Sequence, residues 1–114
     1  MLRLNHKKLE VYKKSGELVK LIYMITSEFP KSELYGLTSQ IRRASVSVIS
    51  NLSEGASRKS LKERKRFYEI ARSSLVELDT QIELAISLDY ISSDLDRTTK
   101  LVNEVFAMLS SMLK

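Results

Sequence analysis

The sequence predicts an all-α protein, an antiparallel up-down-up-down four-helix bundle formed by a single domain over residues 1–114. Three Gly and one Pro in 114 residues leave few turns, which favours a few long elements over many short strands. Apolar residues recur at helical spacing in four segments that together cover nearly the whole chain. The links between these segments are short, and helices of similar length joined by short links pack as antiparallel neighbours.

The first two predicted helices end at recognisable breaks. The first covers residues 4–28 and stops before Pro30, because proline disfavours helix in the residue that precedes it. Ser32 is expected to cap a short turn that runs through Tyr35. The second covers residues 37–53, with Gly55 as its natural C-terminal stop.

The third helix is predicted to begin at a capping box and the fourth at a serine. In the segment Ser60-Leu61-Lys62-Glu63, the side chains of the first and last residues each satisfy the other's backbone N–H. This helix runs to about Leu88, and a break follows at residues 89–92. Its core stripe is expected at Phe67, Ala71, Ser74, Leu75, Leu78, Ile82 and Ala85. Ser92 or Ser93 is expected to cap the last helix, whose apolar face carries Leu95, Val102, Val105, Leu109 and Met112.

The second helix has two opposed faces. At roughly 100° per residue, its apolar positions fall on one side: Leu37, Ile41, Ala44, Val48 and Leu52. The other side carries Arg43, Ser47, Ser50 and Glu54, with Asn51 close beside them. A helix that only covers a core has Lys and Glu on its outer face, so a file of Ser and Asn indicates an interaction surface.

Excess apolar surface predicts a homo-oligomer. Val46 and Ile49 widen the apolar arc of the second helix to roughly 200°, whereas about 100° suffices to face one core. The third helix carries Val76 and Leu84 on its otherwise polar side. We expect another subunit to cover this excess; the alternative is a scatter of exposed apolar residues, which is normal on monomers.

Composition and charge exclude several classes of protein. No stretch approaches the roughly 20 apolar residues of a membrane span, and the N-terminus has no apolar signal segment. The absence of Cys removes disulfides and thiolate metal sites, so we expect a cytoplasmic protein. The net charge of +5 is uneven: residues 1–72 hold 16 Lys/Arg against 7 Asp/Glu, and residues 73–114 hold 3 against 7. This asymmetry indicates a polyanionic partner or a head-to-tail self-contact.

The strongest chemical signal is a cluster of six basic residues within nine at the start of the third helix: Arg58, Lys59, Lys62, Arg64, Lys65 and Arg66. Cations are mildly unfavourable at the positive end of a helix macrodipole. A phosphate backbone relieves that penalty, since helix N-termini and cationic side chains both attract phosphate. We therefore predict a nucleic-acid contact here, with Arg42 contributing from the second helix. The alternative is a solvated charge run that Glu63 and Glu69 partly offset.

The polar residues of the second and third helices could form an active site or a structural network. The residues concerned are Arg43, Ser47, Asn51 and Glu54, with Arg72 and Glu77 on the third helix. Ser47 has no base to activate it, so the favoured reading is a hydrogen-bonded network at a subunit interface or along a central channel. The lone histidine, His6, lies near the terminus, and no helix pair carries Glu-x-x-His spacing. We expect no cofactor, no metal site and no catalysis.

Six segments of the chain match the sequence pattern of a known family: residues 8–12, 29–30, 35–44, 50–55, 58–60 and 67–81. The most specific of them reads Leu-Thr-Ser-Gln-Ile-Arg-Arg-Ala, residues 37–44. Through these segments the chain resembles the four-helix-bundle family of bacterial 23S rRNA intervening-sequence proteins. It departs from the family at Tyr12, where Trp is usual, and at Ile49, where Pro is common. The second helix should therefore be straighter than in the family.

The resemblance implies a pentameric ring and no established enzymatic activity. A related, similarly basic branch of the family assists retroelement reverse transcriptases and associates with nucleic acid, which implies a possible protein partner of that kind. From the residues and the resemblance together, we expect a non-catalytic scaffold or adaptor that binds RNA or DNA without sequence specificity. The alternative is a scaffold that contacts only proteins and has no nucleic-acid role.

Overall fold

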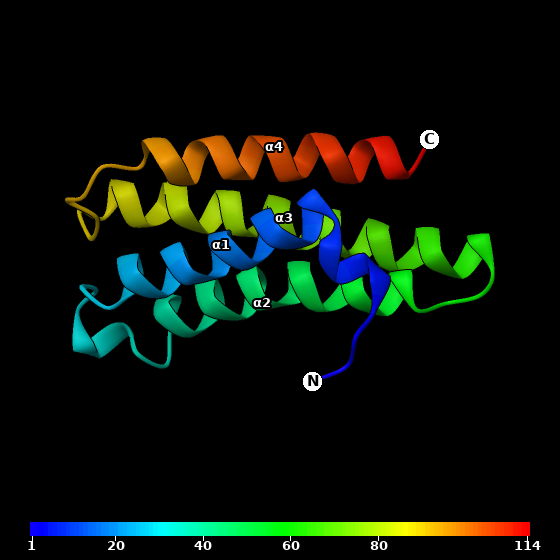
Figure 1. The fold of residues 1–114 in the computed structure, drawn as a ribbon. Helices are drawn as coiled ribbons and strands as arrows, with labels where there is room; N and C mark the ends of the chain where they lie inside the picture. The colour runs from blue at the N-terminus through cyan, green and yellow to red at the C-terminus, as the bar shows by residue number, and fades with distance from the viewer.

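Four α-helices and no strand make up the structure, a computed structural model that describes all of residues 1–114. The helices are α1 (Glu10–Thr26), α2 (Leu37–Ala56), α3 (Leu61–Ser87) and α4 (Asp96–Met112). Two short 3-10 helices, η1 (Asn5–Lys8) and η2 (Lys31–Glu33), precede α1 and α2. The helices alternate in direction and each packs on its neighbours in the chain, with α4 closing against α1 (Figure 1). The predicted all-α four-helix bundle is confirmed.

The core lies between the four helices and is aliphatic. Every helix contributes at least one side chain that is almost fully excluded from solvent: Leu18 and Ile22 from α1, Ile41, Val48 and Leu52 from α2, Leu75 and Leu78 from α3, and Leu101, Val105 and Leu109 from α4. In α3 the predicted stripe is correct from Ala71 to Ala85 except at Ser74, which is only partly buried. At the start of the stripe Tyr68 is buried, whereas the predicted Phe67 is only partly covered.

The start of the first helix differs from the prediction. It begins at Glu10 and not at residue 4, because Leu9 is extended (φ −70°, ψ 142°) and η1 covers the preceding residues. Lys7 and Lys8 would place positive charge at the positive end of a longer helix, whereas the observed first turn carries Glu10. The helix ends at Thr26, ahead of Pro30 as expected.

The second helix passes through Gly55, which is not its C-terminal stop. Gly55 has no positive φ and is buried within α2, which ends one residue later. A Cβ added to Gly55 would lie 2.7 Å from Cε1 of Tyr68 and 3.0 Å from Cβ of Phe67. Glycine is required here because α3 approaches the backbone of α2 too closely for any side chain.

The link from α3 to α4 uses aspartates where serines were expected. Asp89 has a φ of 59°, and the N–H groups of Asp89 and Tyr90 donate to the carbonyls of Ile86 and Ala85, both at 3.0 Å. This pattern is a Schellman motif that ends α3. The predicted Ser92 or Ser93 cap is wrong: Asp94 Oδ1 accepts from the N–H of Asp96 at 2.8 Å, and α4 begins there.

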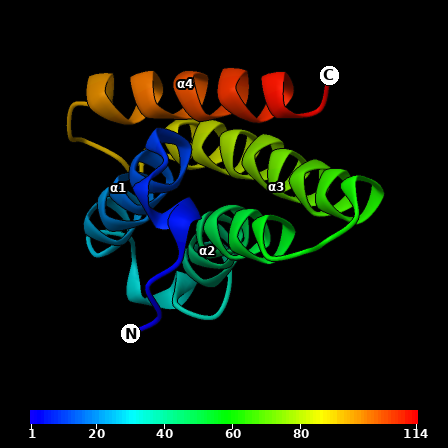
Figure 2. The same cartoon turned by 45° about the vertical axis from the view of Figure 1, so that its right-hand side comes forward.

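The N-terminal end of α3 projects from the rest of the bundle. The molecule measures 43 × 27 × 21 Å, and α3, with 27 residues, is its longest helix. Figures 1 and 2 show α2 and α3 side by side, with the start of α3 and the turn before it extending past α1 and α4. None of the helices is long and apolar enough to cross a membrane.

Ion pairs connect α1 to α4 along their shared edge. Arg97 donates from Nε and Nη2 to the two carboxylate oxygens of Glu17, both at 2.6 Å. One turn earlier in α1, Lys14 pairs with Glu104. The Arg97 hydrogen bonds hold the pKa of Glu17 below its ordinary value, and the Lys14 hydrogen bond does the same for Glu104.

The close approach at Gly55 leads to a first prediction. Gly55→Ala should destabilise the protein by about 1–2 kcal/mol, because overpacking against the Tyr68 ring outweighs the gain in helix propensity. Gly16→Ala is the matched control: it is also in a helix, but its Cβ would meet only Cδ1 of Ile49 at 3.6 Å, so it should stabilise by about 0.5–1 kcal/mol. Urea unfolding measures both changes, and equal effects of the two substitutions would contradict the assignment of Gly55.

The α1–α4 ion pairs predict a specific pH dependence. Because the pKa of Glu17 is lowered by Arg97, the pair contributes stability above the unfolded-state pKa and loses it as the pH falls through the folded-state pKa. Glu17→Gln should therefore lower Tm at neutral pH, and the difference from wild type should close as the pH falls below about 4. Glu83→Gln is the control, since Glu83 is exposed on α3 and forms no ion pair. A Glu17→Gln difference that did not close in acid would refute the account.

Candidate nucleic-acid interface

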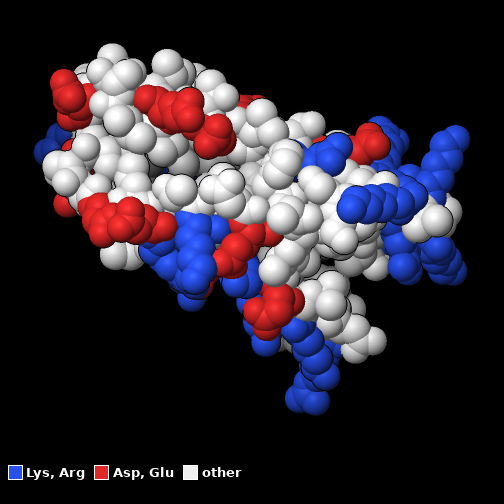
Figure 3. All heavy atoms as spheres, turned by 90° about the horizontal axis from the view of Figure 1, so that it is seen from above, with Lys and Arg blue, Asp and Glu red and all other residues white.

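The predicted basic cluster occupies the projecting α2–α3 corner. We call it the basic tip; it consists of Arg58, Lys59, Lys62, Arg64, Lys65 and Arg66. In Figure 3 the Lys and Arg atoms gather at the end of the molecule where Figure 1 places this corner. The structure therefore brings together all six residues of the predicted cluster, whereas Arg42 lies elsewhere.

The start of α3 is held by its N-cap. Ser60 Oγ accepts from the N–H of Glu63 at 3.1 Å, which is half of the predicted capping box. The returning bond, from the Ser60 N–H to the Glu63 carboxylate, is not made. The Ser60 carbonyl accepts the first helical bond of α3, from the N–H of Arg64 at 3.0 Å. The turn before α3 is thus fixed through Ser60, and the tip cations that follow are presented on helical backbone.

Two arginines of the basic tip are engaged within the chain. Arg58 donates from Nη2 to Glu54 Oε2 at 3.2 Å, and its guanidinium lies 4.8 Å from the centre of the Phe67 ring. Arg64 donates from Nε to the carbonyl of Arg58 at 2.6 Å. These contacts close the turn between α2 and α3, so Arg58 and Arg64 shape the basic tip as well as adding to its charge.

The other four cations of the tip have no carboxylate partner within the chain: Lys59, Lys62, Lys65 and Arg66. Three of them are exposed and Lys65 is partly covered. Lys59 directly precedes the N-cap of α3 and the other three lie on its first turns, where the positive end of the macrodipole adds to their field. An unpaired cluster of this kind attracts anions and, above all, polyanions.

Arg42 lies far from the basic tip. It occupies the first half of α2, roughly 20 Å along the helix from its C-terminal end. Its Nε donates to Thr26 Oγ1 at 2.8 Å, and its guanidinium lies 4.6 Å from the centre of the Tyr23 ring. The sequence grouped Arg42 with the tip residues, and the structure places it against α1 instead.

Part of the predicted polar network joins α2 to α3 inside one chain. The hydroxyls of Ser47 and Ser74 are 2.8 Å apart, and Asn51 Nδ2 donates to the carbonyl and the hydroxyl of Ser47 at 2.8 and 2.9 Å. Glu54 pairs with Arg58 as described, and Glu77 accepts from Gln81 Nε2 at 3.1 Å. The Ser47 hydroxyl, weighed as a nucleophile in the sequence, is thus hydrogen-bonded to Ser74 and Asn51.

The remaining members of the predicted interface are dispersed. Arg72 lies on the opposite flank of α3, where it donates to Ser110 Oγ at 3.2 Å and lies 5.9 Å from the centre of the Phe106 ring of α4. Ile49 is partly buried and lies nearest to Gly16 of α1. Arg43, Val46 and Val76 remain exposed, the last two at 38% and 51%. The structure contains no group of three His, Asp or Glu side chains able to hold a metal ion.

Comparison with known proteins gives one clear match. The family model described as 23S rRNA-intervening sequence protein matches residues 7–111 of this chain, which cover all four helices. A search of curated proteins finds no match.

The N-cap of α3 leads to a prediction about the geometry of the tip. Ser60→Ala should destabilise the protein by about 1 kcal/mol, because the N–H of Glu63 loses its acceptor. Ser60→Asp keeps an acceptor at the N-cap and serves as the control, with a much smaller loss expected. Thermal unfolding measures both, and a Ser60→Ala variant as stable as wild type would show that the cap does not hold the turn.

Proposed function

This chain belongs to the 23S rRNA-intervening sequence protein family, and we propose that it is a non-catalytic oligomeric scaffold that binds nucleic acid without sequence specificity. The binding surface is the basic tip. The observation that carries the proposal is the set of four tip cations, Lys59, Lys62, Lys65 and Arg66, that have no carboxylate partner at a projecting helix N-terminus.

Electrostatics favours phosphate as the natural counterion of the basic tip. Like charges on neighbouring turns of a helix repel, as Lys62 and Arg66 do at i,i+4 spacing. The macrodipole adds to the cost at this end of α3. Phosphate groups relieve both effects, and each contact releases condensed counterions from the nucleic acid, which drives binding.

The tip supports binding without base-specific readout. Its cations surround a helix start rather than presenting a helix face or strand edge of the size that enters a major groove. Aromatic side chains within the tip are engaged elsewhere: Tyr68 is buried against α2, and Phe67 lies under Arg58. The partner is therefore expected to be recognised through its backbone charge.

The exposed apolar residues of α3 and α4 support the oligomer. Val76 and Leu84 on α3 are 51% and 50% exposed, and Phe106 on α4 is 42% exposed. Val76 and Phe106 line the same groove between α3 and α4, and exposed apolar residues that gather in this way mark protein contact surfaces. We propose that another copy of the chain covers them, in the ring of five subunits that the family resemblance implies.

The second candidate function is a scaffold that contacts only proteins. It is favoured by one observation: the C-terminal part of the chain is acidic, with 3 Lys/Arg against 7 Asp/Glu in residues 73–114. On this alternative the basic tip meets the acidic surface of another copy or another protein. The two candidates differ in how binding and assembly respond to salt.

The proposed function is tested by fluorescence anisotropy of an end-labelled RNA across a salt series. The logarithm of the association constant should fall linearly with the logarithm of salt, with a slope of about −0.9 to −0.7 for each phosphate contacted. The variant Lys62→Gln/Lys65→Gln/Arg66→Gln should bind at least tenfold more weakly and with a shallower slope. It spares Arg58 and Arg64, which hold the turn.

A charge-matched control separates the basic tip from overall charge. Lys13→Gln/Lys20→Gln/Lys100→Gln removes the same charge away from the tip and should bind within about twofold of wild type if local contacts dominate. Sedimentation of the same samples should report an assembly that persists at high salt, since apolar burial is not screened. Absence of RNA binding at low salt, with the assembly intact, would overturn the nucleic-acid role and favour the protein-only scaffold.

A further inference from the structure

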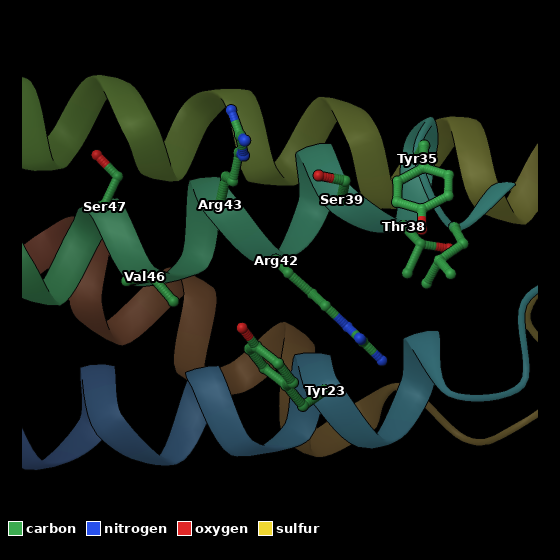
Figure 4. Close-up of a pocket in the computed structure, with 9 residues that line it drawn as sticks. Tyr23, Tyr35, Thr38, Ser39, Arg42, Arg43, Val46 and Ser47 are labelled. Carbon is green, nitrogen blue, oxygen red and sulfur yellow. The ribbon is translucent and has the colours of Figure 1, made fainter.

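A groove lies over the outer face of α2, away from the basic tip. It has a volume of about 530 Å³. Figure 4 shows Tyr23 rising from α1 on one side, Arg43 pointing toward α3 on the other, and Tyr35 at the end where α2 begins. Among its nine lining residues there is no carboxylate: Tyr23, Leu34, Tyr35, Thr38, Ser39, Arg42, Arg43, Val46 and Ser47.

The two arginines make the groove a cationic site. Arg42 is oriented in advance by its hydrogen bond to Thr26 and by the Tyr23 ring beneath it. Arg43 is exposed and forms no ion pair. Neither guanidinium has a carboxylate partner in the chain, so the groove presents two uncompensated positive charges with several hydroxyls around them. A planar guanidinium binds phosphate with two donors at once.

The aromatic residues supply stacking surfaces. Tyr35 is 94% exposed at the mouth of the groove, directly before the start of α2. A tyrosine this exposed has no packing role within the chain, while the face of its ring is open. Bases of single-stranded nucleic acid stack on such rings with little regard to sequence, and neighbouring arginines add to the attraction.

The helix beneath the groove leads directly to the basic tip. α2 is roughly 30 Å long; the groove covers its first half, and its second half leads to the α2–α3 turn. Its outer face carries small hydroxyl residues, Ser39, Ser50 and Ser53 among them. The sole carboxylate in α2 is Glu54, and it is paired with Arg58 at 3.2 Å. No unpaired negative charge on this helix lies between the groove and the tip.

We propose that this groove binds a nucleotide unit, with its base stacked on Tyr35 and its phosphate on the unpaired Arg43, while Arg42 adds positive charge from the α1 side. The unit belongs to a single strand, because bases paired inside a duplex do not expose a face for stacking. The inference rests on the proposed function for the longer ligand, which would extend from the groove along α2 to the basic tip. The groove itself would also accept a free mononucleotide.

The test compares an unstructured RNA with a duplex of the same length. Tyr35→Ala should weaken binding of the single strand by at least about fivefold, while binding of the duplex changes by less than twofold. Tyr35→Phe keeps the ring and should retain single-strand affinity, which excludes loss of the hydroxyl as the cause. Met24→Ala, another exposed apolar residue outside the groove, is the control for general surface effects.

The possible outcomes separate this inference from the proposed function. If the tip variant loses binding and Tyr35→Ala binds the single strand like wild type, the groove inference is overturned and the proposed function stands. If neither RNA binds wild-type protein, the proposed function fails, and adenosine monophosphate tests the groove alone: binding that Tyr35→Ala removes supports it, and no binding overturns it. If Tyr35→Ala or Arg43→Gln dissociates the oligomer without changing RNA affinity, the groove is a contact between subunits and the inference is wrong.

Discussion

The close contact between α2 and α3 is the constraint on which the rest of the structure depends. At Gly55 the backbone of α2 lies so near the Tyr68 ring that no Cβ fits between them. The two helices also share the Ser47–Ser74 hydrogen bond, two turns away in α2. Packed at this distance, they form a stiff pair whose turn projects from the bundle and carries the basic tip (Figure 2). A looser pair would leave the tip cations on a mobile loop, where their spacing would not be fixed.

The polar residues of α2 divide their roles according to the flank on which they lie. Toward α3, Ser47 and Asn51 satisfy one another and Ser74. Toward α1, Arg42 is fixed by Thr26 and Tyr23. The outer face between these flanks keeps hydroxyls and an unpaired Arg43, with no free carboxylate. α2 thus packs against α1, against α3 and, through its apolar face, into the core. Its remaining, outer face is available to a ligand that carries negative charge.

Periodicity predicts most of this fold, because an amphipathic helix repeats its signal over many residues. The four helices and the Ser60 cap follow from the sequence in that way. Gly55 was predicted to end the second helix, but it lies inside α2 where the Tyr68 ring approaches the backbone. A glycine near a helix end serves either purpose, and only the position of Tyr68 distinguishes them. The groove was not predicted either: Tyr23, Tyr35 and Arg42 come from separate segments, and no spacing in the sequence indicates that they meet. Arg72 and Ser47 were grouped for a similar reason, although Arg72 of α3 contacts α4 and Ser47 of α2 contacts α3.

Photo-crosslinking tests the central claim, that nucleic acid lies along α2 from the groove to the basic tip, most directly. A single-stranded RNA carrying thiouridine would be irradiated with the wild-type protein, and the crosslinked peptides identified by mass spectrometry. The account predicts crosslinks to Tyr35 and to peptides from the α2–α3 turn and the start of α3. Crosslinks confined to α4 or to the exposed Val76–Leu84 side of α3 would contradict it.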